Sequence, residues 1–259
     1  MVVLVNAKTK KLEVMRAGDT PTPCNFVDRP VLRLLPILIA IGIVASCGGN
    51  KTAVKDFDTE GDDDAALEAK VTKGVKPIAD QEVAVIETAD FGNIVIELYS
   101  NIAPKMVERF KRLTSEGFYN GTTFHRVNPG SGIVQGGDPL SKDNNPANDG
   151  TGDSPYPNVP GEMSDVLFER GIVAAARQGA NPEAGITEAQ ARDTANCQFF
   201  ISIKRQPQYD RKYAVFGKVI QGINSADAIM GAPTTPENNE RPAEKIVIKS
   251  ITLQPRSKF

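Results

Sequence analysis

The sequence predicts a mainly β protein whose body is an antiparallel barrel closed by helices. Apolar and polar residues alternate in 83–87 (VAVIE) and 93–99 (NIVIELY) around a break that contains Gly92, which is typical of a β-hairpin. Further short apolar segments are separated by connections rich in glycine and proline. Only two segments show helical periodicity, and no alternation of strands and helices indicates a parallel sheet.

The first helix is predicted to begin at Pro104, a residue that suits the first turn of a helix. Apolar residues then repeat at helical spacing from Met106 to Leu113, and Gly117 offers the left-handed conformation that ends many helices. One face of this helix is therefore expected to cover the core. Further strands are predicted at 122–127, 172–176, 198–203, 214–219 and 245–253, and a second helix at 225–230.

Residues 1–46 have the layout of a secretory signal of the lipoprotein type. Arg29 and Arg33 precede an apolar segment, 34–45, which small residues follow. A helix of that length spans about 18 Å, short of the roughly 30 Å hydrocarbon core of a bilayer, so it is not expected to cross a membrane. Residues 44–50 (VASCGGN) resemble a bacterial lipobox, which implies that Cys47 becomes the lipid-modified N-terminus. A plain signal peptide that contains a cysteine is the alternative.

Residues 47–80 are rich in charge and glycine and poor in aromatic residues, which predicts a flexible acidic tether. The body then comprises residues 81–259. Cys197 is the one cysteine in this body, so the sequence predicts no intramolecular disulfide.

Composition and motifs exclude several classes of function. A formal net charge of −2 and a pI near 5.6 give no reason to expect a nucleic-acid partner. His125 is the only histidine, so a histidine metal cluster and chemistry based on two histidines are both unavailable. The sequence also lacks a Walker loop, a dinucleotide fingerprint and a nucleophile elbow.

Five sequence motifs occur in order along the body: FYNGTTFHRV, QGGDP, GIVAAARQG, CQFFISI and KYAVFGKV. Together they resemble the cyclophilin family of peptidyl-prolyl isomerases, and the resemblance covers residues 83–253. It implies an eight-stranded antiparallel β-barrel capped by two α-helices, with a groove that binds proline-containing polypeptides. It also implies no metal and no organic cofactor.

The resemblance assigns a role to each site residue. Arg126 matches the catalytic arginine, and Gln135 matches the glutamine that orients it. The remaining matches concern substrate binding: Ile133, Phe200, Tyr209 and Tyr213 for the proline pocket, and Ala176 and Arg177 for the neighbouring groove. Without the resemblance, Arg126 would be interpreted as a surface ion-pair partner and Phe200 as a core residue. His125 is expected to point to the opposite face of its strand and to act structurally.

Three departures from the family leave an alternative open. Gly132 stands where an aromatic pocket residue is expected, in a turn that is one residue longer than usual. Tyr209 and Tyr213 replace the leucine and histidine of many members. Extra residues between Arg177 and Cys197 include good helix formers, so a helical turn is expected at 184–191, beside the groove.

The sequence therefore predicts a monomeric, exported prolyl isomerase that assists protein folding in the bacterial envelope. A lipid anchor would hold it facing the periplasm, at the outer membrane rather than the inner one. The alternative is a cyclophilin-like module that binds proline-containing segments without catalysis. A structural β-barrel lipoprotein is a weaker third hypothesis.

Overall fold

The computed structural model describes residues 4–5, 12–13 and 60–259 of the chain. Strands β1 (Leu4–Val5) and β2 (Leu12–Glu13) pair antiparallel, in a unit distinct from the one that contains residues 55–259. The predicted apolar signal segment 34–45 and Cys47 lie outside the described residues. No helix of the described residues is long and apolar enough to cross a membrane.

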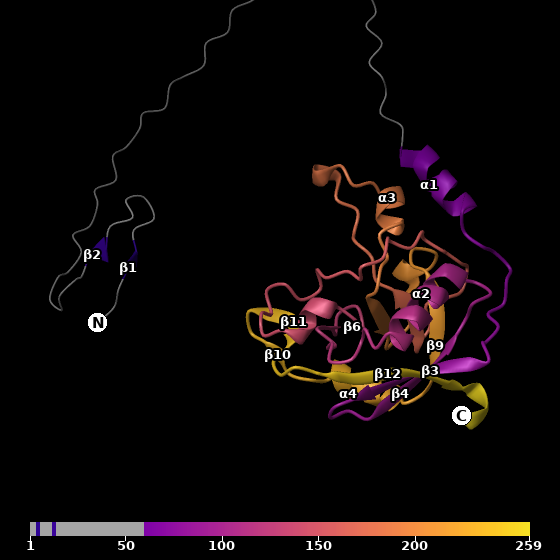
Figure 1. The fold of residues 1–259 in the computed structure, drawn as a ribbon. Coiled ribbons are helices and arrows are strands. Elements are labelled where there is room, and N and C mark those ends of the chain that lie inside the picture. The colour runs from indigo at the N-terminus through magenta and orange to yellow at the C-terminus, as the bar shows by residue number, and fades with distance from the viewer. Residues whose placement is uncertain (1–3, 6–11, 14–59) are drawn as a thin grey trace, which may run out of the picture. The chain divides into compact units, whose positions relative to one another are not determined.

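The body is built on one curled antiparallel sheet of eight strands (Figure 1). Its strands are β3 (Glu82–Thr88), β4 (Asn93–Leu98), β5 (Arg126–Asn128), β6 (Ile133–Gly136), β7 (Ile172–Ala175), β8 (Phe199–Ser202), β9 (Val215–Gln221) and β12 (Ile248–Pro255). The order across the sheet is β12-β3-β4-β9-β7-β8-β6-β5. The two outer segments meet where Phe124 N donates to Ile246 O at 2.9 Å and Ile248 N donates to Thr122 O at 2.8 Å. The predicted eight-stranded antiparallel architecture is confirmed.

Four helices accompany the sheet: α1 (Glu60–Ala69), α2 (Pro104–Ser115), α3 (Glu188–Arg192) and α4 (Ile223–Met230). Helix α2 lies above β12 in Figure 1 and α4 lies below it. Pro104 opens α2 as predicted, and Gly117 follows its end with φ +68°. Phe118 N donates to Leu113 O at 2.9 Å, which satisfies a carbonyl of the last helical turn.

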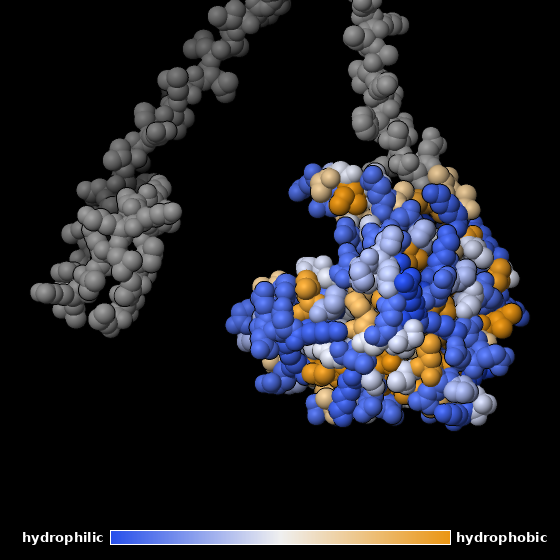
Figure 2. All heavy atoms as spheres, viewed as in Figure 1, coloured by the Kyte–Doolittle hydropathy of each residue, from blue (hydrophilic) through white to orange (hydrophobic). Residues whose placement is uncertain are grey.

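The smaller elements lie in the connections. Strands β10 (Thr234–Thr235) and β11 (Asn238–Pro242) form a separate hairpin, and four short 3₁₀ helices complete the body: η1 (Pro139–Lys142), η2 (Pro182–Ala184), η3 (Pro207–Tyr209) and η4 (Arg256–Lys258). Hydrophilic residues cover most of the face shown in Figure 2.

The core fills the inside of the curled sheet and is centred on aromatic side chains. Phe110 of α2 is fully buried and lies 5.7 Å from Phe199 in an edge-to-face arrangement and 5.2 Å from Phe216. Tyr119 is also buried, and its hydroxyl donates to Cys197 O at 2.9 Å. Edge-to-face aromatic contacts of this kind add stabilisation beyond the burial of apolar area. The predicted apolar face of α2 therefore covers the barrel core.

The sequence predicts a flexible tether at 47–80, but its second part is structured. Residues from Glu60 onward form α1, and the residues after this helix pack against the body. Leu67 and Val71 are buried. Thr72 N donates to Met163 O at 2.9 Å and Asp165 N donates to Thr72 O at 3.0 Å, which adds a short parallel bridge. This segment is mostly charged, but Leu67 and Val71 are apolar and four positions apart, and their burial attaches it to the body.

Replacing Phe110 by alanine is expected to lower the free energy of unfolding by about 3–5 kcal/mol, because it leaves a cavity among packed aromatic rings. Urea denaturation measures the change. The matched control is Phe259→Ala at an exposed terminal ring, which should change stability by less than about 0.5 kcal/mol. Equal losses in the two variants would contradict the assignment of Phe110 to the core.

Candidate active site

The pairing of four neighbouring strands places the predicted catalytic and pocket residues in one row. Arg126 of β5 lies opposite Gln135 of β6, Gln135 lies opposite Phe200 of β8, and Phe200 lies opposite Ala174 of β7. Side chains directly opposite one another on an antiparallel pair are in contact range. Their sequence neighbours Val127, Val134 and Phe199 point the other way, into the barrel core.

Arg126 is held by side chains at two of its nitrogens. Its Nη1 donates to Gln135 Oε1 at 3.3 Å, and its Nε donates to Glu240 Oε2 at 2.5 Å. The side chain remains 41% exposed. Its guanidinium therefore keeps N–H donors that face solvent, since five are available in all.

Gln135 is fixed in turn by Gln198. Gln135 Nε2 donates to Gln198 Oε1 at 3.0 Å, and Gln198 Nε2 donates at 3.0 Å to the carbonyl oxygens of Gly150 and Gly152. A continuous set of hydrogen bonds thus runs from the guanidinium of Arg126 to the backbone of the loop that follows β6. Such a set restricts the rotamers of both Arg126 and Gln135.

His125 is buried, while the neighbouring Arg126 is partly exposed. Burial lowers the pKa of His125, and the positive charge of Arg126 acts in the same direction. The imidazole is therefore neutral at physiological pH. His125 lines the same cleft as Arg126 and Gln135, so the expectation that it points away from the site is not met.

Beside Arg126 and Gln135 lies a second apolar cluster, outside the barrel core. Phe200 is its centre: Phe168 stacks on it at 6.0 Å, and Tyr209 and Tyr213 meet it edge-on at 6.0 and 5.3 Å. Ile133 belongs to the same cluster. All four residues predicted for the proline pocket, Ile133, Phe200, Tyr209 and Tyr213, are thus brought together.

The surrounding rings cover Phe200 almost completely, so that it is only 3% exposed. Phe168 is fully buried, whereas Tyr209 and Tyr213 are half-buried and form the outer layer of the cluster. A proline ring that approaches this cluster would first contact the two tyrosine rings. Only a small part of the Phe200 side chain is open to direct contact in this arrangement.

The predicted groove residues Ala176 and Arg177 follow directly after β7. With Gln135, Gln198 and Gly150, among others, they line a pocket of about 270 Å³ next to the row of Arg126, Gln135 and Phe200. The pocket continues the surface on which Arg126 and Phe200 lie, because Gln135 belongs to both. It is large enough to receive a side chain of an extended peptide.

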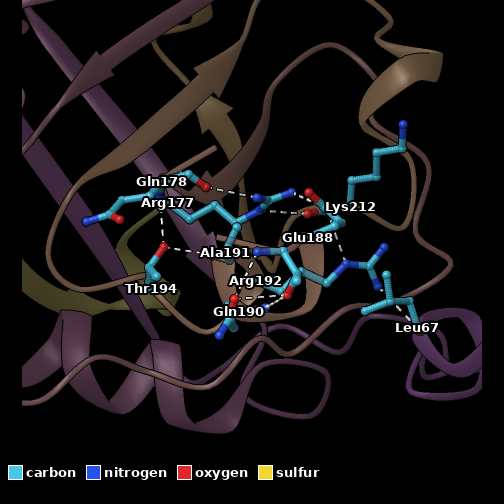
Figure 3. A network of polar contacts seen from close by, with 10 residues as sticks. Leu67, Arg177, Gln178, Glu188, Gln190, Ala191, Arg192, Thr194 and Lys212 are labelled. Atoms are coloured by element: carbon cyan, nitrogen blue, oxygen red, sulfur yellow. Dashed lines mark hydrogen bonds and ion pairs between the residues drawn. The ribbon is translucent and has the colours of Figure 1, made fainter. Parts of the chain in front are cut away.

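The insertion between Arg177 and Cys197 is tied to this groove by a partly buried ion pair. Figure 3 shows Arg177 and Arg192 approaching Glu188 from two sides. Arg177 Nη2 donates to Glu188 Oε1 at 2.6 Å, and its guanidinium lies 4.7 Å from the centroid of the Tyr213 ring. The side chain of Arg177 is only 5% exposed. The insertion thus supports the wall of the aromatic cluster.

The structure places short helical elements in the insertion, as expected from its composition. They are η2 and α3, and α3 begins with a capping box in which Thr187 and Gln190 bond each other's backbone N–H groups. Arg192 Nη1 also donates to Leu67 O of α1 at 3.3 Å. The rim of the groove therefore contacts helix α1, which lies within the segment predicted to be a tether.

The position of Gly132 has no space for the aromatic side chain that the resemblance to the cyclophilin family predicts there. Its φ is +64°, and a Cβ would lie 2.7 Å from Lys204 Cγ and 2.9 Å from Gln206 Nε2. The longer turn after β5 requires this left-handed residue, since Gly132 N donates back to Asn128 O at 2.6 Å. An aromatic neighbour for Phe200 comes instead from Phe168, on the segment before β7.

Cys197 is a buried structural residue by all its contacts. Burial raises the pKa of its thiol to about 12, and the nearby carboxylate of Asp153 acts in the same direction. The thiol is therefore protonated and unreactive at neutral pH. Among the residues that the structure describes, no group of three or more histidine, cysteine or acidic residues is arranged to hold a metal ion.

Two contacts of the site were not predicted from the sequence. Phe168 carried no recognisable signal apart from its apolar character, and Glu240 lies 114 positions after Arg126 in a short polar hairpin. Neither shares a local pattern with the residue that it touches. The predicted lipid-modified residue Cys47 lies outside the described part of the chain.

Comparison with known proteins gives a consistent result. The family model for cyclophilin type peptidyl-prolyl cis-trans isomerases matches residues 83–253. A probable peptidyl-prolyl cis-trans isomerase of Brucella suis is 36% identical over 177 residues, which are 67% of this chain and 84% of the relative. The chicken (Gallus gallus) peptidyl-prolyl cis-trans isomerase-like 3 is also 36% identical, over 66% of this chain and 96% of the relative.

Solved structures of similar fold belong to the same class. The crystal structure of a cyclophilin type peptidyl-prolyl cis-trans isomerase of Cryptosporidium parvum matches with a TM-score of 0.57 and 28% sequence identity, over 68% of this chain and 98% of that one. A second crystal structure of that protein, in the presence of the dipeptide Ala-Pro, matches with a TM-score of 0.56 and 27% identity. It covers 67% of this chain and 99% of that one.

Replacing Gly132 by alanine is expected to lower the free energy of unfolding by about 2–3 kcal/mol. The left-handed conformation costs about 1–2 kcal/mol for a residue with a Cβ, and the collision with Gln206 adds to it. Gly185→Ala is the matched control, because Gly185 has φ +71° but open space around it. Thermal or urea denaturation should show a clearly smaller loss for Gly185→Ala, and equal losses would contradict the crowding at Gly132.

Proposed function

The chain belongs to the cyclophilin-type family of peptidyl-prolyl cis-trans isomerases, and we propose that Arg126 supplies the catalytic interaction in a groove formed by β5, β6 and β8. The observation that carries this assignment is the row of Arg126, Gln135 and Phe200 across three paired strands. It puts a fixed cation beside an apolar aromatic surface. A substrate proline needs both.

The chemistry requires no covalent step. Amide resonance opposes rotation about an X-Pro bond with a barrier of roughly 18–20 kcal/mol, and uncatalysed exchange takes tens to hundreds of seconds. In the twisted state the proline nitrogen becomes pyramidal and gains a lone pair. A hydrogen bond from the guanidinium to this nitrogen is much stronger in the twisted state than in the planar one, so it lowers the barrier.

Arg126 suits this role because its charge is permanent and its planar fork of donors is rigid. Gln135 accepts from Nη1 and so turns the guanidinium toward the groove. The proline ring would pack against Tyr209, Tyr213 and Ile133, with Phe200 beneath them, while backbone groups near Ala176 and Arg177 would bond the flanking peptide. No metal and no organic cofactor take part in this mechanism.

A second function rests on a specific observation, the coverage of Phe200. If the tyrosine rings stay in place, the groove would bind proline-containing segments at its surface without gripping the ring firmly enough to favour the twisted state. The protein would then act as a binding module. The ordered contacts of Arg126 with Gln135 and Glu240 favour catalysis, because a binding module gains nothing from an oriented guanidinium.

For the cellular setting, we propose export and lipid modification of Cys47, followed by residence in the bacterial envelope on the periplasmic side, at the outer membrane. The support is the signal-like sequence of residues 1–46 and the lipobox-like segment around Cys47. A single domain held in this way would meet newly exported chains and accelerate their X-Pro exchange. It would act as a monomer, since the barrel core is complete within one chain.

Replacing Arg126 by alanine is expected to lower kcat/KM for an Ala-Pro peptide by roughly 10²–10³-fold, as for the loss of a transition-state hydrogen-bond donor. Exchange spectroscopy by NMR measures cis/trans interconversion directly. Arg112→Ala is the matched control, because Arg112 forms an exposed ion pair with Glu116 on α2, away from the groove. The catalytic assignment fails if folded Arg126→Ala retains the activity of the unchanged protein.

Replacing Cys47 by alanine is expected to release the protein from the membrane fraction of the cells that produce it. Mass spectrometry of the mature N-terminus should show the lipid on the unchanged protein and none on the variant. Cys24→Ala is the control, because Cys24 precedes the proposed cleavage position. Retention of Cys47→Ala in the membrane fraction would contradict a lipid anchor at this residue.

A further inference from the structure

The guanidinium of Arg126 has a second support that the family mechanism does not supply. The hydrogen bond from Nη1 to Gln135 is 3.3 Å long, at the weak end of the usual range. A partly exposed arginine has several rotatable bonds and loses considerable entropy when it is fixed. Gln135 by itself is therefore a loose restraint on the catalytic side chain.

Glu240 provides the stronger contact. Its Oε2 accepts from Arg126 Nε at 2.5 Å, and its Oε1 accepts from Asn128 Nδ2. Arg126 and Asn128 are two positions apart on β5, so they project from the same face of the strand. One carboxylate thus bridges two side chains of the strand that carries the catalytic residue.

Each partner in this bridge belongs to a segment that further hydrogen bonds hold in place. Asn128 Oδ1 accepts from Ser131 N at 2.8 Å, within the lengthened turn after β5. Glu240 N donates to Asn238 Oδ1 at 3.0 Å, and Ala243 N donates to Pro233 O at 2.8 Å across the β10–β11 hairpin. Glu240 is therefore presented by an ordered element and not by a free loop.

The choice of nitrogen matters for catalysis. Nε is the nitrogen nearest the backbone, so a bond to it fixes the plane of the guanidinium and leaves the terminal nitrogens available. With Nε on Glu240 and one Nη1 hydrogen on Gln135, three N–H groups remain for the substrate. A charge-assisted bond is also roughly twice as strong as a neutral one.

The bridge does not close the site. Arg126, Gln135, Glu240 and Arg241 line a cleft of about 250 Å³, and the side chains of Arg126 and Glu240 remain 41% and 37% exposed. The guanidinium is thus restrained from one side while another side stays open. A contact that blocked the site would bury Arg126 instead.

We propose that Glu240, delivered by the β10–β11 hairpin and joined to Asn128, is a positioning residue that fixes the guanidinium plane of Arg126 for X-Pro isomerisation. This inference rests on the proposed catalytic role of Arg126. It adds to that role a residue from a distant part of the chain. The hairpin is thereby part of the active site.

The test uses the full chain with Glu240→Ala and Glu240→Gln. Glu240→Ala is expected to lower kcat by roughly 10- to 100-fold with little change in KM, as for a misplaced catalytic group. The kcat of Glu240→Gln should lie between those of Glu240→Ala and the unchanged protein, because the amide oxygen still accepts from Nε but carries no charge. Glu237→Gln, at an exposed position in the turn of the same hairpin, is the matched control and should leave the activity unchanged.

Two further measurements separate positioning from general structural support. The Nε–H resonance of Arg126 in a ¹H–¹⁵N NMR spectrum should shift in Glu240→Ala while the backbone spectrum of the barrel is preserved. In a double-mutant cycle, Arg126→Ala/Glu240→Ala should be no slower than Arg126→Ala, because Glu240 acts only through Arg126. A further loss in the double variant would overturn the proposal.

An unchanged kcat in Glu240→Ala would also overturn the proposal. An increased kcat would overturn it as well, because it would mean that the ion pair with Glu240 competes with substrate for Arg126. These outcomes are distinct from failure of the catalytic assignment itself. In that case Arg126→Ala would be as active as the unchanged protein, whatever the Glu240 variants do.

Discussion

The register between β5, β6 and β8 is the constraint on which the active site depends. Side chains alternate along each strand, so a slip of one residue would turn Arg126 and Gln135 inward and their neighbours outward. Burial of Val127, Val134 and Phe199 in the barrel core makes such a slip costly. The row of Arg126, Gln135 and Phe200 is therefore set by apolar side chains on the opposite face of the same strands.

The polar contacts of the site extend this order beyond the sheet. From the lengthened turn after β5, bonds lead through Asn128 and Glu240 to Arg126, then through Gln135 to Gln198 and the loop after β6. The extra residue of the turn is accommodated by the left-handed Gly132. The lengthened turn, a departure from the usual family sequence, thus supports the proposed catalytic residue Arg126 and does not merely remove a pocket wall.

The rim of the groove is assembled from segments that are distant in sequence. Glu188 of the insertion holds Arg177 beneath Tyr213, and Arg192 of the same insertion reaches the backbone of α1. Arg211, close to the pocket residues Tyr209 and Tyr213, pairs with Glu68 of α1 at 2.5 Å. Helix α1, which lies within the segment predicted to be a tether, therefore contacts the rim through both Arg192 and Arg211.

Local sequence patterns by themselves predicted most strands of the sheet, helix α2 with its Pro104 start and Gly117 end, and the partition between buried and exposed faces, because periodicity reports which side of an element meets the core. They did not predict β6, the short strand that carries Ile133 and Gln135. The ordered motifs also identified Arg126, Gln135 and Phe200 as a group. Only the tertiary structure decided that Phe168 covers Phe200, that Glu240 binds Arg126, and that residues after Glu60 pack on the body. These contacts join segments far apart in the chain. Which residues meet depends on the packing of the whole barrel, and a local pattern of polar and apolar residues contains no information about it.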